Sequence, residues 1–279
     1  MRADGKKVKN LDPMHLVGAY FMNKRVDAMN MTTIDIPYEP LQSYINEKRK
    51  QGINISHMSL IIAAYVRTLN DFPELNYFVV NKKIYERNEI SIGMVVLSSL
   101  KNHEATEAKM YFEKTDTIFD VNDKINTFIK ENRETPENNG MEKFLKAFLK
   151  IPGILTVGVG LLRFLDKHGL LPKSLINISP FHMSMGITNL ASIRTNHIYH
   201  HCYEFGTTSL FMAMGKSREV VRRKNGEIIF EKCIPIGVTM DERICSGSYF
   251  SSAFKTLKRY LKNPEMLETP FEAKNENNT

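Results

Sequence analysis

Two groups of residues have types and spacing that could do chemistry. In the first, the apolar run Ile234–Met240 leads directly into Asp241, Glu242 and Arg243. Charged side chains that follow a buried strand lie at the end of a sheet, where functional sites are often built. The alternative is a salt-bridged turn at the surface, which is the commoner use of these residue types.

The second group is a histidine cluster beside a cysteine: His197, His200, His201 and Cys202. Zinc sites combine imidazoles with thiolates or carboxylates at characteristic spacings. This cluster has no carboxylate and no second cysteine at such a spacing, so we expect exposed imidazoles on a strand and turn, and no metal. A further segment, Ile154–Leu162, is apolar and flanked by basic residues. It is either a core helix or a surface that rests on a membrane or lines a substrate channel.

Several common site motifs are absent from the sequence. It has no P-loop, no dinucleotide-binding glycine fingerprint, no H-E-x-x-H and no G-x-S-x-G. The three cysteines form no Cys-x-x-Cys pair and no disulfide framework, which fits a reducing compartment. The longest apolar run, Ile151–Leu162, is shorter than the roughly 20 residues of a transmembrane helix, and Met1–Asn10 is not a secretory signal. We therefore expect a cytoplasmic protein.

The composition indicates a folded, basic protein. The 279 residues are 42% hydrophobic and 25% charged, which excludes a wholly disordered chain. The formal charge of +7 and the pI near 9.1 favour anionic partners. Lysines and arginines are spread along the chain, however, and the densest patch, Lys216–Lys224, has no aromatic residues on which bases could stack. We expect no nucleic-acid partner and consider an anionic small ligand or a membrane surface instead.

Periodicity predicts a mixed α/β domain. Apolar spacing and capping residues predict helices at 41–50, 57–70, 118–132, 141–150, 154–168 and 248–261. Strands are predicted at 90–97 and 109–112, short β-rich runs over 175–240, and an Asn225-Gly226 hairpin between 220–223 and 227–230. The hairpin argues against an all-parallel sheet. We expect one domain at 13–268, with a basic N-terminal arm at 1–12, a loop excursion near 131–142 and a flexible tail at 269–279.

The segment after Met240 also resembles a known family, the catalytic domain of the dihydrolipoamide acyltransferases of 2-oxoacid dehydrogenase complexes and their relative chloramphenicol acetyltransferase. The family motif Asp-His-Arg-x-x-Asp-Gly is similar to Asp-Glu-Arg-Ile-Cys-Ser-Gly at Asp241–Gly247. Other landmarks follow in the family's order: Leu60–Leu69 with Pro73–Asn76, Ser91–Val96, Ile187–Leu190, Phe211–Lys216 and Lys262–Leu267. The resemblance covers residues 13–268 and implies an α/β, chloramphenicol acetyltransferase-like two-layer sandwich, with a mixed β-sheet packed with helices.

The resemblance implies a site with one residue kept and two replaced. Thr188 corresponds to the family hydroxyl that hydrogen-bonds the oxyanion. Glu242 stands where the family has the general-base histidine that takes a proton from the thiol of coenzyme A or dihydrolipoamide. A carboxylate is ordinarily a weaker base than imidazole by about two pKa units. Ser246 replaces the second aspartate of the motif and cannot form the same ion pair, and with Glu242 and Thr188 it completes the expected catalytic set. Three residues are expected to be structural at the site: Asp241, Arg243 and Gly247.

We therefore expect an acyltransferase that moves an acyl group between coenzyme A, or another acyl thioester, and an unknown acceptor. The resemblance implies a homotrimer with active sites at the subunit interfaces, coenzyme A or acyl-CoA as co-substrate, and no metal. Loss of both the histidine and the aspartate leaves a rival interpretation open, a non-catalytic trimeric binding or scaffold protein. A third interpretation is a protein that contacts a membrane surface, without spanning it, through Lys143–Lys167.

Overall fold

The computed structural model describes residues 2–99, 104–134 and 154–271. Its main sheet has seven strands in the order β2-β10-β8-β7-β5-β6, with β9 paired to β10 beyond this path. β7 runs parallel to β5 and β8, and the other neighbours are antiparallel, which confirms the expected mixed sheet. The strands are β2 (Met29–Pro37), β5 (Ile90–Ser99), β6 (Glu104–Phe112), β7 (Met185–Asn189), β8 (Leu210–Met214), β9 (Arg218–Lys224) and β10 (Glu227–Asp241).

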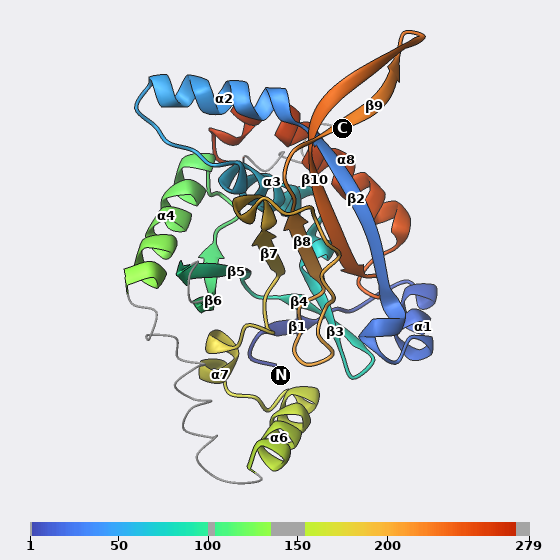
Figure 1. Cartoon of the computed structure of the whole chain (residues 1–279). Coiled ribbons are helices and arrows are strands. Elements are labelled where there is room, and N and C mark those ends of the chain that lie inside the picture. The colour runs from blue at the N-terminus through green and yellow to red at the C-terminus, as the bar shows by residue number, and fades with distance from the viewer. Residues whose placement is uncertain (1, 100–103, 135–153, 272–279) are drawn as a thin grey trace.

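Helices cover one face of this sheet (Figure 1). α3 packs against α8, α2 and α4, and α4 also contacts β5 and β6. Ser56 caps α3 by accepting a hydrogen bond from the backbone N–H of Ser59 at 3.0 Å, as its position before the apolar run predicts. Alternate strand residues such as Ile236 and Val238 point into the same core. These helices are α2 (Tyr38–Lys50), α3 (His57–Asp71), α4 (Ile118–Glu134) and α8 (Gly247–Lys262).

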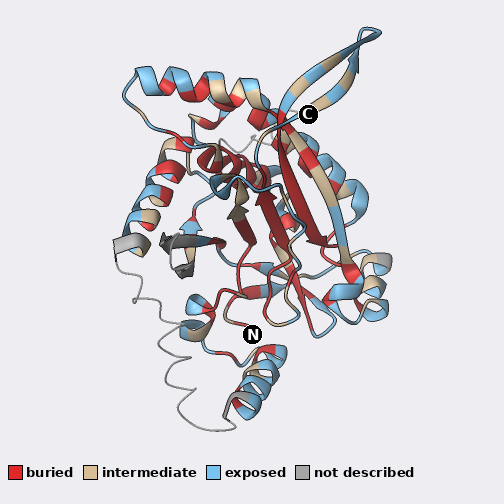
Figure 2. Ribbon diagram, viewed as in Figure 1, coloured by how far each residue is buried: buried red, intermediate tan, exposed pale blue. Residues whose placement is uncertain are grey.

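The other face of the sheet is covered mainly by the chain that leads into β8. The C-terminal half of β10 and all of β8 are buried on both faces (Figure 2). The covering segment lies so close that a side-chain carbon on Gly237 would be 2.1 Å from the carbonyl oxygen of Ile198. This segment was expected to be β-rich, but residues 194–209 are irregular.

A second, three-stranded sheet has the order β1-β4-β3. It incorporates the N-terminus, because β1 (Gly5–Lys7) pairs antiparallel with β4 (Lys83–Arg87), which pairs with β3 (Tyr77–Val80). Arg2 is only 7% exposed and bonds both Asp4 and Asp166. Residues 2–8 of the basic N-terminal segment therefore pack on the domain.

The remaining elements complete the outline of the domain. They are α1 (Pro13–Phe21), α6 (Ile154–His168), α7 (Lys173–Ile178) and the 3-10 helices η1 (Arg25–Ala28), η2 (Pro73–Asn76), η4 (Leu190–Ile193) and η5 (Pro264–Leu267). Residues 131–134 of the expected loop belong to α4, which continues through Glu134. The rest of that loop and the helix expected at 141–150 lie outside the described residues. Of the expected tail, Thr269 accepts a hydrogen bond from Arg67 through its carbonyl. In the described ranges, no helix combines the length and apolarity that a membrane span requires.

Candidate active site

A buried double ion pair fixes the turn at the end of β10. The Asp241 carboxylate is 0% exposed and accepts hydrogen bonds from Arg243 Nε at 2.8 Å and Nη2 at 2.7 Å, and from Arg25 Nε at 3.2 Å. Burial acts to lower the pKa of Arg243, but the hydrogen bonds and charge of Asp241 outweigh it and raise that pKa. The turn is therefore an internal framework and not the solvated surface turn that the residue types alone favour.

Glu242 faces outward from this framework. Its backbone N–H donates to the carbonyl of Ala28 at 2.9 Å, which ties the turn to η1. The carboxylate is half-buried, and its Oε2 accepts a hydrogen bond from the side-chain amide of Asn30 on β2. No partner for Oε1 is found in the part of the chain that the structure describes. Glu242 therefore combines a fixed backbone with a carboxylate oxygen that is open to a ligand.

Ser246 and Gly247 have simple roles in a single copy of the chain. Ser246 caps α8: its Oγ accepts from the backbone N–H of Tyr249 at 3.3 Å and bonds Ser248 Oγ at 2.9 Å. It is exposed, and among the described residues no hydrogen bond joins it to Glu242. A side-chain carbon built on Gly247 would meet nothing within 4 Å. Within one chain, therefore, neither Ser246 nor Gly247 contributes a polar group to a site around Glu242.

Thr188 lies on the same sheet but far from Glu242. It is half-buried on β7 and pairs with Ala213 of β8, which pairs with Gly237 of β10. Glu242 follows Gly237 by five residues, so at about 3.3 Å per residue the two side chains are separated by about 16 Å along the strands. β7 is also two strands away from β10, which adds about 10 Å across the sheet. One chain therefore does not bring Thr188 and Glu242 together.

The histidine cluster serves to pack the irregular segment onto the sheet. His197 Nε2 bonds Thr33 Oγ1 at 3.0 Å, and the His200 ring stacks on Phe211 with centroids 4.3 Å apart. Cys202 is buried beneath it, and burial raises the pKa of this thiol to about 12, so it is held as an unreactive thiol. Across the described ranges, no group of three or more His, Cys, Asp or Glu side chains is arranged to hold a metal ion.

A buried Asp-His-Ser array was missed at the sequence level. Asp166 Oδ1 lies 3.2 Å from His182 Nε2, and His182 Nδ1 lies 2.8 Å from Ser179 Oγ. Burial lowers the pKa of His182 despite the neighbouring carboxylate, so the imidazole is neutral. All three side chains are nearly inaccessible, and Ser179 Oγ also accepts from the Phe181 backbone at 3.3 Å. The array joins α6 to the segment after α7 and does not present a nucleophile to solvent.

The segment flagged as either core or membrane surface is the helix α6. Its inner side is anchored through Asp166, which bonds Arg2 Nη2 at 2.6 Å. Val157, Leu161 and Phe164 recur at helical spacing and are 73%, 55% and 55% exposed. One side of α6 is therefore packed on the protein and another side exposes apolar residues. Contact of that side with a membrane stays a prediction.

Comparisons with known proteins identify the fold and a family pattern in the C-terminal part of the chain. The family described as 2-oxoacid dehydrogenases acyltransferase (catalytic domain) matches residues 206–269, which span β8, the hairpin, the motif and α8. A search of curated protein sequences gave no significant match. The structure is similar to the cubic core of a pyruvate dehydrogenase multienzyme complex, with a TM-score of 0.60, 9% identity and 94% of each chain covered.

Two further solved structures have the same fold. The dihydrolipoamide acetyltransferase of Azotobacter vinelandii, in which a serine, a histidine and an asparagine were investigated for their role in the catalytic mechanism, has a TM-score of 0.59, with 9% identity over 94% of each chain. A chloramphenicol acetyltransferase has a TM-score of 0.56, with 11% identity over 92% of this chain and 99% of the other. The chain thus has the two-layer fold of chloramphenicol acetyltransferase and of the 2-oxoacid dehydrogenase acyltransferase catalytic domains, and residues 206–269 carry the sequence pattern of the latter family.

Proposed function

We propose that this protein is an acyltransferase that moves an acyl group between coenzyme A, or another thioester, and an acceptor, with Glu242 in the place of the family histidine. The observation that carries the proposal is the position of Glu242 on a rigid, buried framework with one carboxylate oxygen open. In the Azotobacter enzyme the asparagine follows the histidine by four residues, as Ser246 follows Glu242.

The proposed chemistry uses two residues of this chain. The Glu242 carboxylate accepts the proton of the attacking group, and the nucleophile adds to the thioester carbonyl. The Thr188 hydroxyl donates a hydrogen bond to the oxyanion that forms, a contribution worth about 100-fold or more in rate. Collapse of the tetrahedral intermediate expels the thiolate, which takes the proton back from Glu242. Coenzyme A is the proposed co-substrate, and no step needs a metal.

The proposed active site lies between two copies of the chain. The distance of about 16 Å along the sheet between Thr188 and Glu242 excludes joint action within one copy. A ring of identical subunits places different parts of one surface opposite each other, and the related pyruvate dehydrogenase core is itself a multimeric cubic assembly. We propose a homotrimer in which Glu242 of one copy meets Thr188 of the next.

A second candidate function is a non-catalytic scaffold of the same fold. It is favoured by Ser246, which caps α8 and is exposed, and by the replacement of the histidine by glutamate. In this case the trimer would persist while the carboxylate has no role in turnover.

The proposal is tested by incubating the protein with a panel of acyl-CoA thioesters and mixed acceptors, and following release of free thiol by mass spectrometry. Glu242→Gln is compared with Asn30→Ala, which removes the one hydrogen-bond partner that the carboxylate has among the described residues but leaves the base. We expect turnover that disappears in Glu242→Gln and persists in Asn30→Ala. Turnover that is equal in all three proteins would contradict the role of Glu242. A stable trimer without turnover would favour the scaffold.

A further inference from the structure

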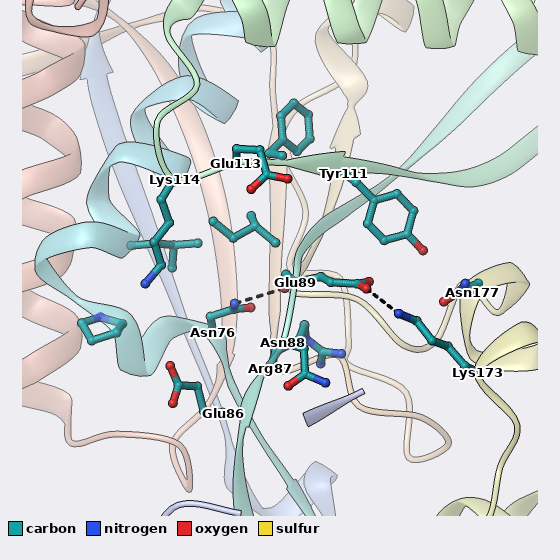
Figure 3. Close-up of a pocket in the computed structure, with 14 residues that line it drawn as sticks. Asn76, Glu86, Arg87, Asn88, Glu89, Tyr111, Glu113, Lys114, Lys173 and Asn177 are labelled. Atoms are coloured by element: carbon teal, nitrogen blue, oxygen red, sulfur yellow. Dashed lines mark hydrogen bonds and ion pairs between the residues drawn. The ribbon is translucent and has the colours of Figure 1, made fainter. Parts of the chain in front are cut away.

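A cavity of about 630 Å³ opens beside the junction of β4 and β5 (Figure 3). Its walls come from η2, the β4–β5 junction, the end of β6 and α7. A much smaller inner chamber, of about 20 Å³, adjoins it. Both spaces are lined by Arg87, Glu89, Tyr111, Lys173 and Asn177. The two spaces therefore form one site with an outer cavity and an inner chamber.

Two cations line the inner chamber, of which Arg87 is buried and Lys109 is partly buried. Arg87 is 7% exposed, and its Nη2 donates to the carbonyl and hydroxyl oxygens of Thr207 at 2.8 and 3.0 Å. Its Nε has no partner in the described part of the chain. Lys109 Nζ donates to the carbonyls of Ile176 at 2.5 Å and His182 at 3.0 Å. Within the described ranges, neither cation is ion-paired to a carboxylate. Both have only neutral partners, although both face a cavity.

The carboxylates that face these cations are already occupied. Asp4, from the N-terminal segment, bonds Arg2 Nε at 2.9 Å. Glu89 pairs with Lys173 Nζ at 2.9 Å, at the boundary between the two spaces (Figure 3). A buried cation without a counterion is costly, and proteins normally pair or neutralise it. Arg87 and Lys109 also repel each other, so the chamber is a place where an anion would be strongly stabilised.

The size of the inner chamber selects the kind of anion. A space of about 20 Å³ holds little more than one water-sized group, for which about 10–15 Å³ is the minimum. The end of a planar carboxylate fits this space better than a tetrahedral phosphate. In the outer cavity, the Oδ1 of Asn76 is buried and has no hydrogen-bond donor among the residues that the structure describes. It would accept from a hydroxyl on the same ligand.

We propose that the inner chamber binds the carboxylate of a small hydroxycarboxylic acid whose remaining groups occupy the outer cavity. The bound carboxylate accepts hydrogen bonds from Arg87 Nε and from the third N–H of Lys109, and the hydroxyl donates to Asn76. This site shares no residue with the Glu242 turn, so the proposal does not depend on acyl transfer.

The protonation of Lys109 gives the site a pH dependence. Burial, with the charge of Arg87, lowers the pKa of Lys109 to about 7, while Glu89 and Asp4 act to raise it. Lys173, Tyr111 and the neutral His182 are the other titratable groups around the chamber. An anion next to Lys109 favours the ammonium form, so binding above pH 7 takes up a proton. Affinity should fall as pH rises.

The experiment is isothermal titration calorimetry of the full chain with L-lactate and D-glycerate, using L-lactamide as the neutral analogue. We expect both acids to bind at least about tenfold more tightly than lactamide, because only they neutralise the two cations. Affinity for the acids should fall about tenfold or more between pH 7 and 9. Titrations at pH 8 in two buffers of different ionisation enthalpy measure the number of protons taken up on binding. We expect close to one proton per acid bound.

The variant Lys109→Met should lose about tenfold or more in affinity and the pH dependence, while Lys130→Met, at an exposed position of α4, should change neither. The proton-uptake measurement on the unmodified chain decides the question if Lys109→Met fails to fold. Equal binding of lactate and lactamide, no binding of either acid at about 10 mM, or no proton uptake at pH 8 would overturn the proposal. Tighter binding of chloride or phosphate would also overturn it, because the chamber would then be a site for an inorganic ion.

Discussion

Two corners of the molecule bury charge in opposite ways. At the β10–α8 corner, Asp241 receives hydrogen bonds from two guanidinium groups, so the charges compensate one another inside the protein. At the corner formed by β4, β6 and α7, Arg87 and Lys109 have only neutral oxygen partners and border a cavity. Compensated buried charge acts as framework, whereas uncompensated buried charge beside a cavity indicates a ligand. The first corner positions Glu242, and the second is built to receive an anion.

The largest effect is expected from breaking the compensated corner. Asp241→Asn keeps the shape of the side chain but leaves Arg25 and Arg243 buried without a counterion, which should cost about 3–5 kcal/mol in the free energy of unfolding. The matched control is Asp35→Asn, which breaks the pair of Asp35 with the exposed Arg218 and should cost less than about 1 kcal/mol. Urea denaturation measures both. Similar losses in the two variants would show that the Asp241 ion pairs are not a framework.

A smaller effect is expected from two glycines on either side of the same corner. Gly237→Ala should destabilise the domain by about 1–3 kcal/mol, because its new methyl would be 2.1 Å from the backbone of Ile198. Gly247→Ala should leave the stability of a single copy nearly unchanged, since nothing lies within 4 Å. Thermal unfolding of both variants checks this ranking. A stable Gly237→Ala protein would mean that the segment covering the sheet is not held closely.

The smallest effect concerns pH at the uncompensated corner. Burial lowers the pKa of Lys109 from 10.5 to about 7, so between these values the unfolded chain binds more protons than the folded one. Folding stability contributed by Lys109 must then rise with pH. Lys109→Met removes this dependence. Between pH 7 and 9 the unfolding free energy of the unmodified chain should therefore rise by about 1 kcal/mol relative to that of the variant. If the difference in unfolding free energy between the two proteins stays constant over this range, Lys109 does not carry an uncompensated charge in the folded protein.

Much of the helical layer and the hairpin could be predicted from the sequence, because long amphipathic periods and Asn225-Gly226 are local features. The helix expected at 57–70 ends one residue later, at Asp71, and β9 and β10 flank the predicted turn. The small sheet could not be predicted. Its strands are only 3 to 5 residues long, and β1 is mostly charged, so neither length nor alternation distinguishes them from loops.

The candidate sites were predictable to different degrees. The turn at Asp241 was found because its residues are contiguous and resemble a family motif. The chamber was not found, because Lys109 meets its partners across 67 and 73 residues of chain and Arg87 across 120. A lone lysine in a predicted strand has no sequence feature that distinguishes a buried amine from an exposed one. Such burial is decided by segments that only the fold brings together.

The most direct test of the proposed active site is complementation between two inactive variants. Glu242→Gln and Thr188→Val are each expected to lose about 100-fold or more in acyl transfer. If the site forms between copies, oligomers co-assembled from equal amounts of both should recover about a quarter of the unmodified activity, because that fraction of interfaces joins an intact Glu242 to an intact Thr188. Co-assembled oligomers that remain as inactive as the separate variants would contradict a site shared between copies.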